Sequence, residues 1–375
     1  MKRTCLVAIA TVVAACAAVI VTPTDAAAQL GDIMKRAQQV KELVISEADE
    51  IRLGQGISEK VRARYGVVQD PAVHRYVTLV GAVLATSSKR PGLPWTFIIL
   101  DTDGVNAFAT PGGFIHVTRG ALGLLSNESE LGGVLAHEIT HVTGKHTIKA
   151  LQKSKGLQLA ANETLGDSAV FNRFVEQGTG LVLAGFSRDE ELESDSEGMK
   201  LANAIGYQPA GLGVFLQRLS DRNKAATEKQ GLFASHPEMK ERVDRLAKLA
   251  AAVKPAGTAT LEERYRKYVT YTAKPQTEIA GVEAGAAGLA GGSGKSDKTK
   301  DEEKKEEQPK KKGFGLGSLM KPTGSESKSA EVTGSGASRG VDTERNAKGG
   351  SNPKLVVVNL QMSDISAFKK EGGLK

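Results

Sequence analysis

Two histidines four residues apart, at the end of an apolar run, limit what this chain can fold into more than any other feature. Residues 131–136 are all apolar or small, and they lead directly into the sequence HEITH, which contains His137, Glu138 and His141. Residues four apart stand on one face of a helix, so both imidazoles can reach one ion. An apolar helix is buried, and a buried imidazole needs a partner, which a metal can supply. The sequence therefore predicts a buried helix with a metal site.

The glutamate inside this motif predicts hydrolytic chemistry. A catalytic zinc ion usually has three protein ligands and one position open to water. Glu138 directly follows the first histidine, and we expect it to be the general base that takes a proton from the metal-activated water and passes it to the leaving amine. The motif also occurs by chance on surface helices that bind no metal, so a third ligand elsewhere in the chain is needed. One zinc ion per chain is expected.

A second helical stretch offers that third ligand. It contains three glutamates and an aspartate in the sequence EELESD, residues 190–195. Glu191 and Asp195 are four apart and share a helix face, whereas Glu193 points nearly the opposite way from Glu191. Like charges on one face repel each other unless something neutralises them. We therefore expect Glu191 to bind the zinc ion together with the two histidines, and Asp195 to accept a hydrogen bond from a ligand histidine.

Hydrophobic periodicity around these motifs predicts an α+β fold that is predominantly α-helical. Apolar residues recur at helical spacing, and short runs with β-branched and aromatic residues mark three strands. The expected helices cover 32–65, a stretch that begins at Asp70-Pro71, 128–146, 187–204, 209–222, 237–252 and 261–271, and the expected strands cover 95–100, 106–109 and 114–118. The strands should form a small antiparallel sheet that flanks the HEITH helix. The less regular part, 156–185, is expected to include a mobile segment near the site.

The first 28 residues have the features of an export signal peptide. A positively charged start precedes an apolar run from 5 to 21, and the small residues that follow suit cleavage before Gln29. A second interpretation is a lipoprotein signal, in which Cys16 would carry a lipid that anchors the protein to a membrane. A third is an anchor that is never cleaved. All three place the body of the protein outside the cytoplasm, and the first predicts the periplasm.

Composition changes beyond Tyr271. The chain becomes rich in glycine and alanine, then in mixed charges, and then in serine, glycine and lysine. Such a composition cannot bury enough apolar surface to fold. We therefore expect one zinc-binding domain over 29–272, a disordered low-complexity linker over 273–351, and a short C-terminal element over 352–375 in which 355–358 has strand character and 363–370 can form a helix.

The charge of the chain gives no sign of a nucleic-acid partner. The net charge is +7, but the basic residues are scattered among acidic ones and form no stripe interleaved with aromatic residues. A solvated surface is expected, with at most a weak, peripheral attraction to a membrane.

Four motifs in order resemble the gluzincin zinc metallopeptidase family that includes the CAAX prenyl endopeptidase, HtpX and the periplasmic protease BepA. They are the sequence NAFATPGG from Asn106, the HEITH helix, the pair Glu191 and Asp195, and the sequence SHP from Ser235 followed by Arg242. The resemblance runs over about 47–249 and is nearest to the exported, BepA-like branch. Ser194 departs from the family, in which alanine usually precedes the aspartate, but serine is small enough to leave the ligand assignment standing.

The resemblance implies a gluzincin metallopeptidase domain in which Glu191 is the third zinc ligand. It also implies that Asn106, Ala107 and Phe108 belong to an edge strand that binds a polypeptide substrate by pairing with its backbone.

The remaining site assignments are less specific. The resemblance places His236 of the SHP motif near the zinc ion, where it would either stabilise the oxyanion or block the metal; a loop histidine that caps a helix is the alternative. Arg242 would either steady the substrate or pair with an acidic residue. His74, His116 and His146 have no comparable setting, and we expect them to be structural or exposed.

These observations together predict a zinc-dependent endopeptidase that hydrolyses peptide bonds of polypeptide substrates outside the cytoplasm. By resemblance, the substrates are misfolded or stalled outer-membrane proteins, and the outer-membrane assembly machinery is an expected partner. The alternative is a periplasmic chaperone or assembly factor that uses the same fold with little proteolysis. The intact HEITH sequence favours the enzyme, because a binding protein has no need of Glu138.

Overall fold

The structure, a computed structural model, describes residues 45–154, 168–223, 235–236, 239–275 and 352–375. The strands are β1 (Thr96–Leu100), β2 (Ala107–Thr110) and β3 (Phe114–Thr118), and a short 3-10 helix η1 (Pro111–Gly113) joins the last two. The helices are α2 (Glu47–Tyr65), α3 (Pro71–Ala85), α4 (Arg119–Leu124), α5 (Glu128–Thr143), α6 (His146–Lys153), α8 (Ser168–Ala184), α9 (Arg188–Ile205), α10 (Gly211–Asn223), α12 (Met239–Ala252), α13 (Glu262–Tyr268) and α14 (Met362–Glu371).

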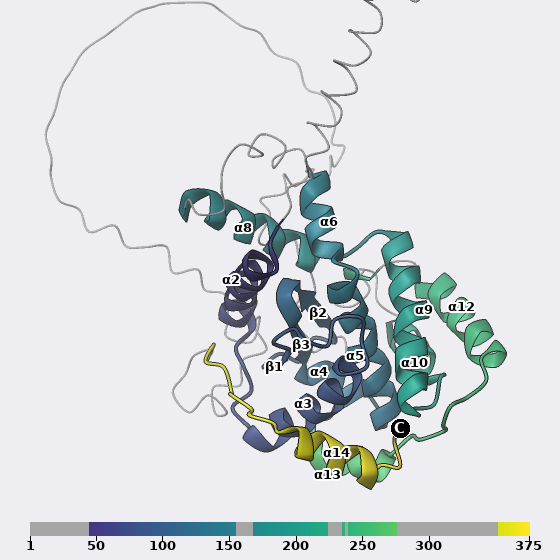
Figure 1. The fold of residues 1–375 in the computed structure, drawn as a ribbon. Coiled ribbons are helices and arrows are strands. Elements are labelled where there is room, and N and C mark those ends of the chain that lie inside the picture. The colour runs from purple at the N-terminus through teal and green to yellow at the C-terminus, as the bar shows by residue number, and fades with distance from the viewer. Residues whose placement is uncertain (1–44, 155–167, 224–234, 237–238, 276–351) are drawn as a thin grey trace, which may run out of the picture. The chain divides into compact units, whose positions relative to one another are not determined.

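Helix α5 is the buried helix that the HEITH sequence predicts, and it lies in the middle of the helices and strands of Figure 1. Asn127 caps it by accepting a hydrogen bond from the backbone N–H of Glu130 at 3.1 Å, and the helix ends before Gly144. Helices α3, α9 and α10 pack against it, and so does strand β2. Every residue from 128 to 142 is buried, so α5 has no polar outer face and depends on this packing.

The two helices before the sheet begin where their capping residues predict. Ser46 caps α2 by accepting a hydrogen bond from the N–H of Asp49 at 3.1 Å. Asp70 caps α3 in the same way, with Pro71 in the first turn, where its missing N–H costs nothing. The described part of the chain therefore confirms the predicted helix over 32–65 from Glu47 onward.

The three predicted strands form one sheet, but its pairing is mixed rather than wholly antiparallel. The order is β1-β3-β2, and β2 runs antiparallel to β3 as expected. The expectation is wrong for β1, which lies parallel to β3 with Ile98 opposite His116. An antiparallel sheet with its strands in chain order would have β2 in the centre. Here β3 follows η1 and takes the central position between β1 and β2. Strand β2 is left at one edge of the sheet.

A regular helix, α8, occupies part of the segment for which an irregular structure was expected. Residues 168–184 are helical, while 155–167 lie outside the described part of the chain. The glycines of this segment weakened the helical pattern, but one of them is needed for packing. A side chain at Gly178 would place its Cβ 2.5 Å from the side chain of Ile57 on α2. Close packing between α8 and α2 thus explains a glycine within the segment whose pattern is less regular.

The C-terminal element is helical as predicted, but its expected strand does not form. Helix α14 covers the predicted segment 363–370, whereas 355–358 pair with no strand of the described sheet. The outer edge of β1 is already bridged, because Val67 pairs with Leu100.

The predicted signal peptide, with Cys16 and the expected cleavage position before Gln29, lies outside the described residues, and so does 276–351 of the predicted linker. Among the helices that the structure describes, none combines the length and the apolar character required to cross a lipid bilayer.

His116, on the central strand, gives the fold a predictable response to acid. Its Nε2 atom lies 2.9 Å from the hydroxyl of Ser58. Burial lowers the pKa of His116 to about 3, and the charge of Arg62 acts in the same direction. The unfolded chain binds a proton here below about pH 6.5, whereas the folded chain does not until about pH 3, so the folded state loses stability as the pH falls between these values.

We therefore expect the protonation of His116 in the unfolded chain to lower the free energy of unfolding as the pH falls from about 6 to 4. The contribution of His116 to this slope is at most about 1.4 kcal/mol per pH unit. Urea unfolding of the wild type and of His116→Leu across this range measures it. The variant leaves Ser58 without its partner at every pH, so only the slopes are compared. Equal slopes for the two proteins would contradict the assignment.

Candidate metal centre

Four buried side chains from three parts of the chain meet at one point beside α5. They are His137 and His141 on α5, Glu191 on α9, and His236, which precedes α12. One ligand atom from each lies within 4.8 Å of the other three. Sequence reasoning named all four of these residues, and the structure brings them together.

The spacing of three of these groups fits a tetrahedral metal ion. The Nε2 atoms of His137 and His141 are 3.0 Å apart, and each lies 3.5 Å from a carboxylate oxygen of Glu191. Bonds of about 2.0–2.1 Å to a tetrahedral ion place neighbouring ligand atoms about 3.3 Å apart. Two imidazole nitrogens that face each other can share only one proton, whereas a cation gives both of them and the carboxylate a common partner. The residues present therefore fit a divalent metal ion.

A buried arginine holds the acidic side chains of α9 in place. Arg242 donates two hydrogen bonds to Asp195, from Nε at 2.8 Å and from Nη2 at 2.6 Å, and its Nη1 atom lies 2.8 Å from Glu191. Asp195 in turn lies 3.0 Å from Nδ1 of His137. Arg242 therefore pairs with acidic residues. This is one of the two roles that the sequence left open, the other being contact with the substrate. One guanidinium fixes both carboxylates that face the two histidines.

Charges around the cluster keep both of these carboxylates ionised. Burial acts to raise the pKa of Glu191, but the charges of His236 and Arg242 outweigh it and hold the pKa well below its usual value. Burial opposes ionisation of Asp195 as well, and the hydrogen bonds from Arg242 outweigh it, so this pKa is also lowered. Two negative charges are thus available at the centre at neutral pH.

The two histidines of α5 differ in their affinity for protons. Burial and the charge of His137 lower the pKa of His141 well below its usual value. Burial acts in the same direction on His137, but its contacts with Asp195 and Glu191 outweigh burial and raise the pKa to about 9. A metal ligand has to be a deprotonated imidazole, so metal binding at this centre is coupled to the release of a proton from His137.

His236 faces both Glu191 and Glu138. Its Nδ1 atom lies 2.9 and 3.0 Å from the two oxygens of Glu191, so an N–H at this position donates to the carboxylate. Its Nε2 atom lies 3.7 Å from Oε1 of Glu138. A loop histidine that only caps a helix would not be buried among metal-binding groups, and this alternative does not describe His236.

Glu138 is buried next to the cluster with one oxygen unused. Its Oε2 atom has no hydrogen-bond partner among the side chains and backbone that the structure describes. Burial raises the pKa of Glu138, while the charges of His236 and His137 act against burial. An orphaned buried oxygen beside a metal-binding cluster is available to accept a proton from a small molecule there.

Sequence reasoning missed two residues that fix the ring of His141. Nδ1 of His146 lies 2.8 Å from Nδ1 of His141. The ring of Phe186 stacks on the ring of His141, with 4.0 Å between the two centroids. A continuous helix would turn a residue five positions on well away from the face of His141. After α5 ends at Thr143, the turn at Lys145, whose φ is 55°, brings His146 back, so the helical pattern alone could not have found it.

Close backbone contact lets α9 reach the histidines. A side chain at Gly198 would place its Cβ 2.8 Å from the backbone nitrogen of His137. Gly198 lies about one turn after Asp195, so the glycine brings the acidic face of α9 against α5. A second glycine, Gly185, has φ of 94°, and a Cβ there would lie 1.9 Å from the carbonyl oxygen of Ser235. Both positions need glycine to assemble the centre.

The predicted substrate-binding residues lie at the start of the edge strand β2 and are all buried. The Oδ1 atom of Asn106 accepts hydrogen bonds from the N–H of Ala107 at 2.9 Å and from the hydroxyl of Ser235 at 3.0 Å. The ring of Phe108 stacks on Tyr65 of α2. Asn106 thus ties the strand to the residue before His236, and within the described sheet β2 pairs with β3 alone.

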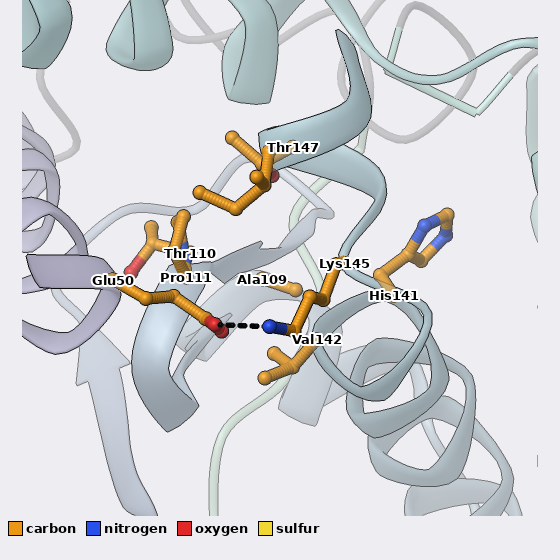
Figure 2. A pocket seen from close by; sticks show the side chains of 9 residues that line it. Glu50, Ala109, Thr110, Pro111, His141, Val142, Lys145 and Thr147 are labelled. Carbon is orange, nitrogen blue, oxygen red and sulfur yellow. Dashed lines mark ion pairs between the residues drawn. The ribbon is translucent and has the colours of Figure 1, made fainter. Parts of the chain in front are cut away.

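A small pocket adjoins the other side of α5, between the end of β2 and the turn into α6 (Figure 2). Figure 2 shows the ring of His141 turned away from Glu50 and Lys145, whose side chains form an ion pair at 3.2 Å. Arg90 donates to the same buried carboxylate of Glu50 at 2.7 Å. This pocket therefore lies where the end of α5 packs against α2, and it adjoins the cluster through His141, which is among its lining residues.

Comparison with known proteins gives one family. A family profile described as "Peptidase family M48" matches residues 71–250, which include all four groups of the cluster. The "Beta-barrel assembly-enhancing protease" of Yersinia pestis is 28% identical over 230 residues, which are 58% of this chain and 47% of that protein. The protein of the same name from Escherichia coli strain K12 is 24% identical over 234 residues, 59% of this chain and 48% of its own length. "Metalloprotease YcaL" of the same strain is 28% identical over 160 residues, 41% of this chain and 62% of its own. The chain thus spans about half the length of the first two relatives.

Proposed function

Because the profile of peptidase family M48 matches residues 71–250 and the chain is similar to proteins named as proteases, we propose that it is a zinc-dependent endopeptidase of this family whose metal is held by His137, His141 and Glu191. The observation that carries the proposal is the triangle of ligand atoms with sides of 3.0, 3.5 and 3.5 Å. Two imidazoles and one carboxylate are a donor set that zinc uses in catalytic sites, where three protein ligands leave a fourth position to water or substrate.

A bound zinc ion supplies a Lewis acid that polarises the scissile carbonyl and lowers the pKa of water. Glu138 does the proton transfer. Its unused Oε2 atom accepts the proton of the attacking water and afterwards returns it to the nitrogen of the leaving amine. Burial raises the pKa of Glu138 above its usual value, which is the direction that makes a carboxylate a better proton acceptor.

Four further residues orient these groups. Asp195 fixes His137 through Nδ1, and Arg242 fixes Asp195 and Glu191 together. His146 fixes His141 from the other side. His236 donates to Glu191 and turns its second nitrogen towards Glu138, a position from which an N–H of His236 can stabilise negative charge on the oxygen of the scissile carbonyl.

We propose that the substrate binds along the outer edge of β2, where its backbone adds a strand to the sheet. The position of β2 at the edge of the described sheet supports this, and so does the bond between Asn106 and Ser235, which ties the start of the strand to the site. Ala107 and Phe108 then contribute through their backbone, because their side chains are buried.

The substrate class follows from the signal peptide and from the relatives. A predicted export signal over 1–28 and relatives named for enhancing β-barrel assembly support a periplasmic enzyme that cleaves misfolded envelope proteins, with the outer-membrane assembly machinery as its partner. Peripheral contact with a membrane belongs to the same proposal, and a lipid anchor at Cys16 is the alternative to cleavage before Gln29.

Metal removal tests the proposed function. The mature chain from Gln29 is expected to contain one zinc ion and to cleave casein, to lose cleavage when zinc is stripped with a chelator, and to regain it when zinc is returned. Metal content is measured by mass spectrometry and cleavage by the release of labelled peptides. Cleavage that persists in the metal-free protein would sink the proposal, as would a purified protein that binds no zinc at all.

A further inference from the structure

The last 24 residues of the chain, 352–375, lie against the domain although 276–351 separate them from its other described residues. We call them the C-terminal segment. The backbone N–H of Val67 donates to the carbonyl of Asn352 at 2.7 Å, and at the other end the N–H of Lys375 donates to the carbonyl of Ile205 at 2.8 Å. In Figure 1 this segment, drawn in yellow, runs past α3 to α13. Contacts at both of its ends hold it on one surface.

The helix of this segment buries one face and exposes the other. Ile365 and Phe368, three residues apart on α14, are buried, whereas Met362 is 67% exposed. The ring of Phe368 lies edge-on to Tyr76 of α3, with 6.1 Å between centroids. The guanidinium of Arg264 on α13 lies over the same ring, 3.9 Å from its centroid. An amphipathic helix thus fills an aromatic and cationic site.

Three arginines of the domain bind oxygen atoms of the segment. Arg62 donates to the carbonyl of Pro353 at 2.5 Å, and Arg75 forms an ion pair with Asp364 at 2.9 Å. Arg264 donates to the carbonyl of Phe368, near the end of α14, at 2.9 Å. The positive charge of Arg264 lies near the C-terminal, partially negative end of α14. The negative charge of Asp364 lies in the first turn, at the partially positive N-terminal end. The charges of the surface therefore match the polarity of the docked helix.

Arg264 also connects this surface to α5. Its Nε and Nη2 atoms donate to the carboxylate of Glu128, the first residue of α5, at 2.7 and 2.5 Å. The hydroxyls of Tyr76 and Tyr207 donate to the same carboxylate at 2.9 and 2.7 Å. One guanidinium therefore binds the start of the HEITH helix and the end of α14, and the ring of Phe368 covers it.

We propose that the surface of α3, α13 and the first turn of α5 is a binding site for an amphipathic helix of the pattern Ile-x-x-Phe, and that this chain's own C-terminal segment is its reversible occupant. Bound, the segment shields the ion pair between Arg264 and Glu128 and contacts the end of α9 at Ile205. It thereby steadies both helices that carry the metal-binding side chains. Released, it leaves this ion pair open to water, and the start of α5 loosens.

The test compares two variants of the full chain. Phe368→Ala is expected to lower the melting temperature by about 6–12 °C, from the usual cost of removing a buried phenylalanine side chain. It is also expected to speed hydrogen exchange in the first turn of α5. Met362→Ala, which changes an exposed side chain of the same helix, is the matched control and should change neither quantity. Equal behaviour of the two variants would overturn the proposal.

Reversible binding is tested by adding the segment as a peptide. A synthetic peptide of residues 352–375 is expected to restore the melting temperature of Phe368→Ala in a saturable way, whereas the same peptide with alanine at 368 should not. In a second experiment a protease site is placed between 276 and 351 of the wild-type sequence and cut after folding, so the segment should leave on dilution and the melting temperature should fall. A cut chain that loses the segment and keeps its melting temperature would refute the idea. None of these measurements uses peptidase activity, so they stand or fall separately from the proposed function.

Discussion

Replacing Glu138 by glutamine is expected to reduce cleavage of casein by about 10²–10⁴-fold while the zinc content stays the same. Glutamine has the size of glutamate and fits the same buried space beside His137, but its amide oxygen cannot take a proton from water and hold it. The metal-binding side chains are unchanged in this variant. Cleavage of labelled casein and metal analysis of the same preparations measure the two effects side by side.

The control for this variant is Glu176→Gln, which removes the same charge from a half-exposed position on α8. It should cleave at the rate of the wild type. If Glu138→Gln retains full cleavage, water is activated by some other group and the assignment fails. A wild type that binds zinc without cleaving, together with a cellular phenotype that survives the substitution, would favour the chaperone or assembly factor as the function.

Replacing Arg242 by methionine is expected to destabilise the fold by about 3–5 kcal/mol, the usual cost of leaving a buried charge without its partner. The guanidinium binds Asp195 through two hydrogen bonds and pairs with Glu191, and all three side chains are buried. Methionine fills much of the space but supplies no charge and no donor. Urea unfolding followed by circular dichroism measures the free energy of unfolding.

The loss should be larger in the presence of a chelator than with zinc, because a divalent cation at Glu191 replaces part of the missing positive charge. Arg245→Met, three residues further along α12 at an exposed position, is the matched control and should stay within about 0.5 kcal/mol of the wild type. If both substitutions lower the free energy of unfolding by the same amount, the bonds from Arg242 to Asp195 do not stabilise the fold more than an exposed arginine does.

Local sequence patterns determined the elements that carry the site. The apolar run before His137 predicts a buried helix because an exposed helix would need a polar face, and α5 is buried over 128–142. Helical spacing selects Glu191 over Glu193, and in the structure Glu191 lies beside both histidines while Glu193 is half-exposed. These inferences succeed because periodicity along one helix fixes which side chains share a face.

Contacts between distant parts of the chain decided the rest. Lys145, between α5 and α6, has a left-handed conformation that returns His146 to His141. The sequence left two roles open for Arg242, contact with the substrate or pairing with an acidic residue. Helix α12 packs against α9, and this packing places Arg242 in hydrogen-bond contact with Asp195. The parallel pairing of β1 with β3 is also a contact between distant parts of the chain, and the pattern along each strand does not determine it.

The sequence by itself thus predicted a mostly helical fold, the residues of the candidate metal centre and the glutamate beside them, since each is encoded within one helix or one short motif. Only the tertiary structure decided how these side chains are held, by Arg242, His146 and Phe186, and what covers the surface at the start of α5. The physical reason is that a side chain's partners lie on other elements. Their approach is set by packing across the core, as between Gly198 and His137, which spacing along the chain does not record.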